Sequence, residues 1–342
     1  MKIALITDTH FGVRNDNAVV ARHQVEFFRS QFIPYLESNG IEGIIHLGDL
    51  VDRRKYISFQ TSRMIREQIL DKLIAYPMFI IAGNHDTFFK NTNEINSLQE
   101  LLTGRYPNIT VIDSPSTIEL DGLKILMLPW ICDENREKSM SQIVNTDSQI
   151  CMGHLELSGF EMYRGSSNEH GMDSGIFTKF DRVFSGHYHH KSSRANIDYL
   201  GAPFTMIWSD YNDPRGFHIF DTQSRHLQFV ANTKSLFHKI DYDDTEKTLE
   251  QILAFDPEVI KDCYVKVQVI AKNNAYWFDL FISALEKLAV DIKVIEFESR
   301  LVIDAIDDIP RDMLSLLISN VSSNVELETY LKTLYNEACA SE

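Results

Sequence analysis

Five short clusters in this 342-residue sequence carry side chains that bind metal ions or transfer protons. Each cluster comes directly after an apolar run, and the five are Asp8-Thr9-His10, Gly48-Asp49, Gly83-Asn84-His85-Asp86, Gly153-His154 and Gly186-His187-Tyr188-His189. Carboxylate, imidazole and amide ligands without thiolates suit divalent ions such as Mn²⁺, Fe²⁺ or Zn²⁺. Seven such ligands are enough for two ions that share one carboxylate and lie roughly 3.5–4 Å apart. We expect Asp49 to be the shared carboxylate.

Each cluster taken alone has an ordinary structural explanation. A lone Gly48-Asp49 or Gly153-His154 is more often a turn than a metal ligand, and only the combination of all five favours a metal site. The remaining histidines lack this spacing and are interpreted as structural or surface residues: His23, His46, His170, His190, His218, His226 and His238. The basic run Arg53-Arg54-Lys55 is open to two interpretations, a solvated surface or a phosphate contact.

The elements around the clusters predict an α/β fold. Residues 1–90 alternate apolar strands at 2–7, 43–47 and 78–82 with helices at 17–38 and 58–75, which predicts a largely parallel sheet. Ligands of such sheets bind at the carboxyl ends of the strands, where the first three clusters lie. A helix at 93–102 precedes short strands at 109–112, 117–120, 123–128, 150–152, 182–184, 199–200, 204–208, 216–221 and 226–230. We expect a four-layer αββα sandwich.

The composition changes near residue 239. Residues 241–244 are interpreted as a turn or linker, followed by a helix at 245–253, a strand at 264–271, a helix at 276–288 and a strand at 292–297. An acidic break at 304–310 then precedes two amphipathic helical patterns at 313–318 and 325–338. We therefore predict three parts: residues 1–238 with the metal site, a small α/β domain at 239–302, and a linker with helices at 303–342.

The net charge of −16 argues at first sight against a nucleic-acid partner. However, residues 241–342 carry 9 Lys and Arg against 21 Asp and Glu, so most of the acidity belongs to the end of the chain. The four cysteines are scattered and indicate reduced thiols. The sequence has no apolar run of membrane-spanning length and no signal-peptide pattern, so we expect a cytoplasmic protein.

The order of the five clusters resembles that of the calcineurin-like metallophosphoesterase superfamily. The resemblance implies a first metal ion bound by Asp8, His10, Asp49 and His189, and a second bound by Asp49, Asn84, His154 and His187. It also implies that His85 contacts the phosphate and protonates the leaving oxygen, and that Asp86 orients His85. Asp52 and Arg53 are further candidates for contact with the substrate.

Two details narrow the resemblance within the superfamily. The segment from Gly48 to Arg53 is similar to a protein phosphatase motif, but Arg54 stands where that motif has glycine. The opening Asp8-Thr9-His10-Phe11-Gly12, followed by Arg14, is similar to SbcD-type recombination nucleases. In size and overall pattern the chain looks most like phage-encoded members of that group, for which the expected location is the host cytoplasm.

The SbcD-type resemblance implies a Mn²⁺-dependent nuclease, with Mg²⁺, Fe²⁺ or Zn²⁺ as other possible ions. Its substrate would be DNA ends, digested 3′ to 5′, with some single-strand endonuclease activity. Residues 239–302 would cap DNA, and residues 303–342 would bind an SMC-like coiled-coil ATPase. The resemblance also implies a homodimer through the helices at 58–75 and 93–102, where Ile65, Ile69 and Leu73 form an apolar stripe. The alternatives are a small-molecule or nucleotide phosphoesterase and a non-catalytic protein that binds DNA ends.

Overall fold

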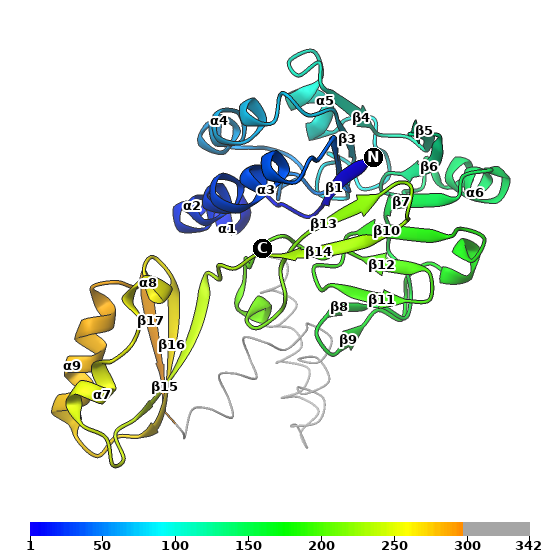
Figure 1. The fold of residues 1–342 in the computed structure, drawn as a ribbon. Coiled ribbons are helices and arrows are strands. Elements are labelled where there is room, and N and C mark those ends of the chain that lie inside the picture. The colour runs from blue at the N-terminus through cyan, green and yellow to red at the C-terminus, as the bar shows by residue number, and fades with distance from the viewer. Residues whose placement is uncertain (297–342) are drawn as a thin grey trace, which may run out of the picture. The chain divides into compact units, whose positions relative to one another are not determined.

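The computed structural model describes residues 1–296 (Figure 1). The chain divides into two compact units, Met1–Leu236 and Phe237–Glu342, and the boundary lies two residues before the predicted one. The predicted linker and partner-binding helices at 303–342 lie outside the described residues. Within residues 1–296, no helix is both long and apolar enough to cross a membrane.

The first unit contains a six-stranded sheet with the strand order β14-β13-β1-β2-β3-β4. Strands β1 to β4 run parallel, whereas β13 is antiparallel to both β1 and β14. Their bounds are β1 (Lys2–Ile6), β2 (Gly43–His46), β3 (Met78–Ile81), β4 (Ile109–Ile112), β13 (Gly216–Asp221) and β14 (Leu227–Ala231). The carboxyl ends of β1, β2 and β3 therefore lie along one edge, as the sequence predicts.

A second six-stranded sheet has the order β11-β12-β10-β7-β6-β5. Its four inner strands are parallel, and β5 and β11 are antiparallel edge strands. The bounds are β5 (Ser116–Leu120), β6 (Leu123–Leu128), β7 (Ile150–His154), β10 (Arg182–Gly186), β11 (Ser192–Arg194) and β12 (Ile197–Tyr199). A small hairpin, β8 (Glu161–Tyr163) and β9 (Ser166–Ser167), follows β7.

Alternating burial shows how the layers pack. In β1, Ile3 and Leu5 join the core between the two sheets, while Ala4 and Ile6 join the core under the helices. The helices over the first sheet are α2 (Ala18–Phe27), the π-helical turn η1 (Phe28–Phe32), α3 (Ile33–Ser38), α4 (Phe59–Gln68), the 3₁₀ turn η2 (Leu70–Lys72) and α5 (Ser97–Leu102). The second sheet is covered by α6 (Arg136–Asn145) and η3 (Ser174–Phe177). The predicted αββα sandwich is confirmed.

One prediction in this unit is wrong, and one helix was not predicted. Residues 204–208 form no strand, because the Asp210 carboxylate accepts hydrogen bonds from the backbone N–H groups of Met206 and Ile207. In the same segment, Thr205 Oγ1 accepts from the backbone N–H of Leu236. This segment leads into the short turn η4 (Trp208–Asp210). Helix α6 was not predicted, since only Ser139 and Ile143 of its residues are buried and the apolar pattern is weak.

The second unit, as far as residue 296, is a three-stranded parallel sheet with helices packed against it. Its elements are β15 (Phe237–Asp243), α7 (Leu249–Leu253), α8 (Pro257–Ile260), β16 (Tyr264–Ala271), α9 (Ala275–Glu286) and β17 (Asp291–Ile295). The turn predicted at 241–244 is wrong, because residues up to Asp243 belong to β15 and pair with β16. The acidic side chains of this segment are typical of a linker, so the strand was not predicted. Phe237 and Tyr242 of the strand are nevertheless buried.

Candidate metal centre

The five clusters converge where the strands of both sheets end. Asp8 and His10 follow β1, Asp49 follows β2, and residues 83–86 follow β3, whereas His154 ends β7 and His187 follows β10. The imidazole Nδ1 of His154 lies 2.7 Å from the carbonyl oxygen of Leu47, which joins the carboxyl ends of the two sheets. Three groups of His, Asp or Glu side chains here have ligand atoms within 4.8 Å of one another.

The four residues expected at the first metal position lie together. His10 Nε2 is 3.5 Å from Asp49 Oδ2 and 3.9 Å from Asp8 Oδ1. The Nε2 atoms of His10 and His189 face each other at 3.0 Å. Two converging imidazole nitrogens beside two buried carboxylates are a donor set that a divalent cation satisfies.

The residues expected at the second position also meet. Oδ1 of Asn84 lies 3.0 Å from His154 Nε2 and 2.9 Å from His187 Nδ1. Oδ2 of Asp49 is 3.4 Å from His154 Nε2. The same carboxylate oxygen thus lies between His10 and His154, as a carboxylate shared by two ions requires.

Glycine at two strand ends is needed for this close approach. Gly48 has a positive φ of 94°, and a Cβ there would lie 2.6 Å from His154 Nδ1. A Cβ on Gly83 would overlap the side chain of Asp49. Four of the expected ligands themselves have a backbone φ in the left-handed range: Asp8 (φ 51°), His10 (φ 42°), Asp49 (φ 56°) and His187 (φ 88°). Such strain is typical of functional sites, where the surrounding structure holds it in place.

Charge at the centre is dominated by buried carboxylates. Burial lowers the pKa of His10, but Asp52, Asp49 and Asp8 overcome this effect and raise it to about 9. Burial also lowers the pKa of His154. The negative charge of Asp49 outweighs this effect and raises the pKa of His154 to about 9. The pKa of Asp49 is held well below its usual value, despite burial, by these two imidazoles. His187 and His189 differ: burial, together with the neighbouring imidazoles, lowers the pKa of His187 to about 3 and the pKa of His189 well below its usual value. The carboxylates therefore favour a positive charge at His10 and His154, the two imidazoles closest to Asp49.

His85 and Asp86 lie beside the ligands, but they do not contact each other as expected. Nδ1 of His85 contacts the carbonyl oxygen of Asp52, which therefore orients the ring in place of Asp86. The Asp86 carboxylate instead accepts hydrogen bonds from the backbone N–H groups of Gly83, Asp49, Leu50 and Val51. The prediction that Asp86 orients His85 is wrong because the peptide N–H groups of the strand-end loops surround its carboxylate.

The two candidate substrate-binding residues have partners within the protein. Arg53 forms an ion pair with Asp16. Oδ1 of Asp52 lies 3.5 Å from Nδ1 of His10, the ring nitrogen opposite the one that faces the expected metal position. The Asp52 carboxylate can therefore orient the imidazole of His10. The sequence interpretation missed Trp130, whose ring lies 5.2 Å from that of His187. Its position just after the strand β6 is a signal for a residue of the site. It was not selected because an indole cannot bind a metal ion.

Comparison with known proteins agrees with this geometry. The calcineurin-like phosphoesterase family profile matches residues 1–191. The chain belongs to this family. It is 38% identical over 244 residues to exonuclease subunit 1 of Enterobacteria phage T4, which covers 71% of this chain and 71% of that protein. It is 22% identical over 256 residues to a nuclease SbcCD subunit from Staphylococcus saprophyticus, covering 66% of this chain and 67% of that protein.

Solved structures give only a weak likeness. A purple acid phosphatase from yellow lupin seeds aligns with a TM-score of 0.40 and 14% identity, over 67% of this chain and 52% of that one. This value adds nothing to the assignment, which depends on the family profile and on the metal centre itself.

Proposed function

We propose that this chain is the nuclease subunit of a complex that processes DNA ends during recombination and double-strand-break repair. The observation that carries the proposal is the convergence of the seven candidate metal ligands, Asp49 among them, with His85 beside them. Two relatives named as an exonuclease subunit and a nuclease subunit support DNA as the substrate. In the host of a phage, such a protein would act in the cytoplasm.

The donor set fits two divalent ions, and we propose Mn²⁺ as the ion used. Asp8, His10, Asp49 and His189 would hold one, and Asp49, Asn84, His154 and His187 the other. When bound, the ions would lower the pKa of a water molecule and offset the negative charge that develops on the phosphate.

The protein's own contribution to hydrolysis centres on His85. Because Nδ1 carries the hydrogen that it donates to the Asp52 carbonyl, the proton for the departing oxygen must come from Nε2 of the doubly protonated imidazolium ring. The backbone N–H of His85 donates to Oδ1 of Asp49 at 2.7 Å, which fixes this imidazole relative to the shared carboxylate. We propose digestion in the 3′ to 5′ direction, with some endonuclease activity on single strands.

We further propose two protein partners, an SMC-like ATPase and a second copy of this chain. The word "subunit" in the names of both relatives supports a partner chain in a complex, and we propose that the ATPase is this partner. The stripe Ile65, Ile69 and Leu73 cannot mediate dimerisation, because all three side chains are buried in the domain's own core. The outer face of α4 is open instead, with Phe59 96% exposed.

A substrate comparison tests the proposed function. The protein is incubated with Mn²⁺ and end-labelled blunt duplex DNA, in parallel with a chromogenic phosphate mono- or diester. We expect the DNA label to be released. Turnover of the small esters with intact DNA would contradict the proposal and favour a small-molecule phosphoesterase.

In the same assay, His85→Ala is expected to lower the rate of label release by about 10²- to 10⁴-fold, the usual contribution of a general acid. Manganese binding, measured by calorimetry, should stay within error of wild type, since His85 is not among the expected ligands. Loss of binding together with activity would show that His85 holds the centre together instead of transferring a proton.

A further inference from the structure

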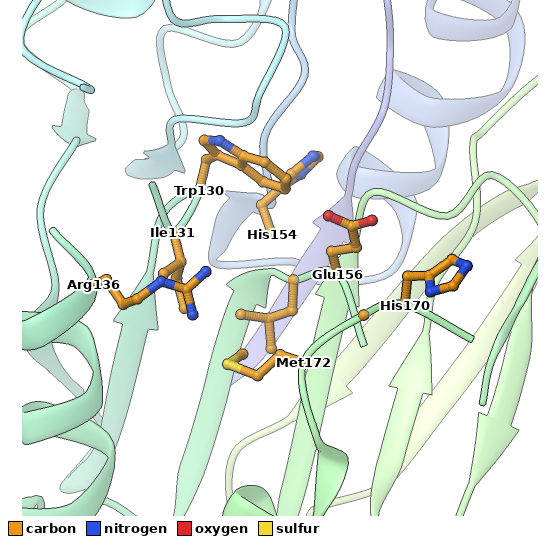
Figure 2. A pocket seen from close by; sticks show the side chains of 9 residues that line it. Trp130, Ile131, Arg136, His154, Glu156, His170 and Met172 are labelled. Atoms are coloured by element: carbon orange, nitrogen blue, oxygen red, sulfur yellow. The ribbon is translucent and has the colours of Figure 1, made fainter. Parts of the chain in front are cut away.

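A cavity of about 330 Å³ opens directly beside the second ligand set. In Figure 2, Trp130 and His154 lie together at one end, Arg136 lies on one side, and Glu156 and His170 lie on the other. Ile131, Leu155 and Met172 contribute apolar surface. The volume lies at the lower end of the range of ligand pockets, roughly 300–1,000 Å³. Polar atoms make up more of its lining than apolar ones, which suits a polar ligand with a flat ring.

Trp130 is held firmly in this cavity wall. Its backbone N–H donates to the carbonyl oxygen of Ala82 at 2.7 Å, just before the Gly83 cluster. Its carbonyl oxygen accepts from the side-chain amides of Asn93 and Asn135, each at 2.9 Å. Three hydrogen bonds from different parts of the chain fix the loop that carries the indole, so its position beside the metal centre is preorganised.

Trp130 and His85 border different parts of the centre. The Trp130 ring lies 5.2 Å from His187 and 6.2 Å from His154, which belong to the second ligand set. The His85 ring lies 4.8 Å from His10, which belongs to the first. Hydrolysis adds a water oxygen to phosphorus and breaks one of its two ester bonds. The oxygen of the broken bond leaves with its nucleoside on the side of His85 and takes up a proton. The other nucleoside keeps the phosphate.

We propose that this cavity binds the base of the nucleotide that leaves with the phosphate, stacked on Trp130 and unpaired from the opposite strand. The inference rests on the proposed nuclease function. An indole offers a flat face to any base, so the pocket serves an enzyme that removes nucleotides irrespective of sequence. Since the cavity has room for a single nucleotide, it suits the terminal nucleotide of a DNA strand.

Arg136 provides the charge that such a ligand needs. It is the first residue of α6, its side chain is exposed, and within residues 1–296 it has no ion-pair partner. A cation on the cavity rim can neutralise a phosphate of the bound strand. Glu156 and His170 on the other side can accept or donate hydrogen bonds at the edge of a base.

The first test compares DNA ends with and without a terminal base. Wild-type protein with Mn²⁺ should release the terminal nucleotide about tenfold faster from an ordinary end than from an end whose last nucleotide is abasic. In Trp130→Ala the ordinary end should slow about tenfold and the ratio should fall to about one. Trp130→Phe, which keeps an aromatic face, should retain part of the ratio. An unchanged ratio in Trp130→Ala would overturn the proposal.

The second test needs no hydrolysis, and therefore separates this pocket from the nuclease proposal. Titration with 5′-dAMP should quench tryptophan fluorescence in wild type and in the control Trp277→Phe, but not in Trp130→Phe. Quenching that persists in Trp130→Phe, or is absent in wild type, would overturn the pocket assignment. Failure to release label from DNA, with quenching intact, would contradict the nuclease function alone. Release of phosphate from 5′-dAMP would overturn the pocket's role at a DNA end.

Discussion

At the scale of single residues, Asp86 supports the site through hydrogen bonds to the backbone of neighbouring loops, although it is not among the expected metal ligands. It is fully buried, and its oxygens accept backbone hydrogen bonds of 2.8–3.2 Å from Gly83, Asp49, Leu50 and Val51. The loops after β2 and β3 are thereby tied to one another. Asp86 thus positions the shared ligand Asp49 through its backbone.

We predict that Asp86→Asn lowers the free energy of unfolding by about 1–3 kcal/mol, because an amide accepts through only one oxygen and places an NH₂ group against backbone N–H donors. Manganese affinity should fall with it. Urea unfolding and calorimetry measure the two effects. The control is Asp113→Asn, which changes a carboxylate that accepts from Gln99 at 2.9 Å outside the site. Equal stability of the two variants would contradict the role given to Asp86.

At the scale of elements, an unusual turn connects β1 to the helices. Arg14, Asn15 and Asp16 all have left-handed backbones, with φ between 55° and 57°. The Asp16 carboxylate accepts from Arg53, from Ser58 Oγ at 2.8 Å and from Thr61 Oγ1. Since Ser58 also caps α4, this one carboxylate joins the turn after His10, the loop after Asp49 and the start of a helix. These bonds offset the cost of the left-handed turn.

The Asp16 cluster predicts a pH dependence of stability. Burial raises the pKa of Asp16, but the bonds from Thr61, Arg53 and Ser58 outweigh it and hold the pKa below its usual value. A depressed pKa in the folded state gives stability that is complete above the unfolded value of about 3.9 and lost as the pH falls through the folded value. Asp16→Asn should therefore be less stable than wild type at pH 7. In urea unfolding at a series of pH values, the difference should shrink below about pH 4; a constant difference would count against this explanation.

At the scale of the whole molecule, the regular elements and the candidate ligands could be predicted from the sequence, and the structure brings these side chains together. Many of the contacts that support them could not be predicted. The parallel strands and their polar ends follow from apolar runs that stop at Gly or Asp, so the convergence of the seven candidate ligands could be predicted. The contacts of Asp86 and Trp130 depend on backbone groups brought together from distant segments, and for Trp130 the only signal in the sequence is its position just after an apolar strand. Strand β15 was missed because its alternating acidic side chains resemble a linker.

The central claim is that Asp49 is shared by two metal ions, and manganese anomalous diffraction from a crystal grown with Mn²⁺ tests it most directly. We expect two peaks on either side of the Asp49 carboxylate, roughly 3.5–4 Å apart. One should contact His10 and His189, and the other Asn84, His154 and His187. A single peak, or two peaks that do not share Asp49, would contradict the claim.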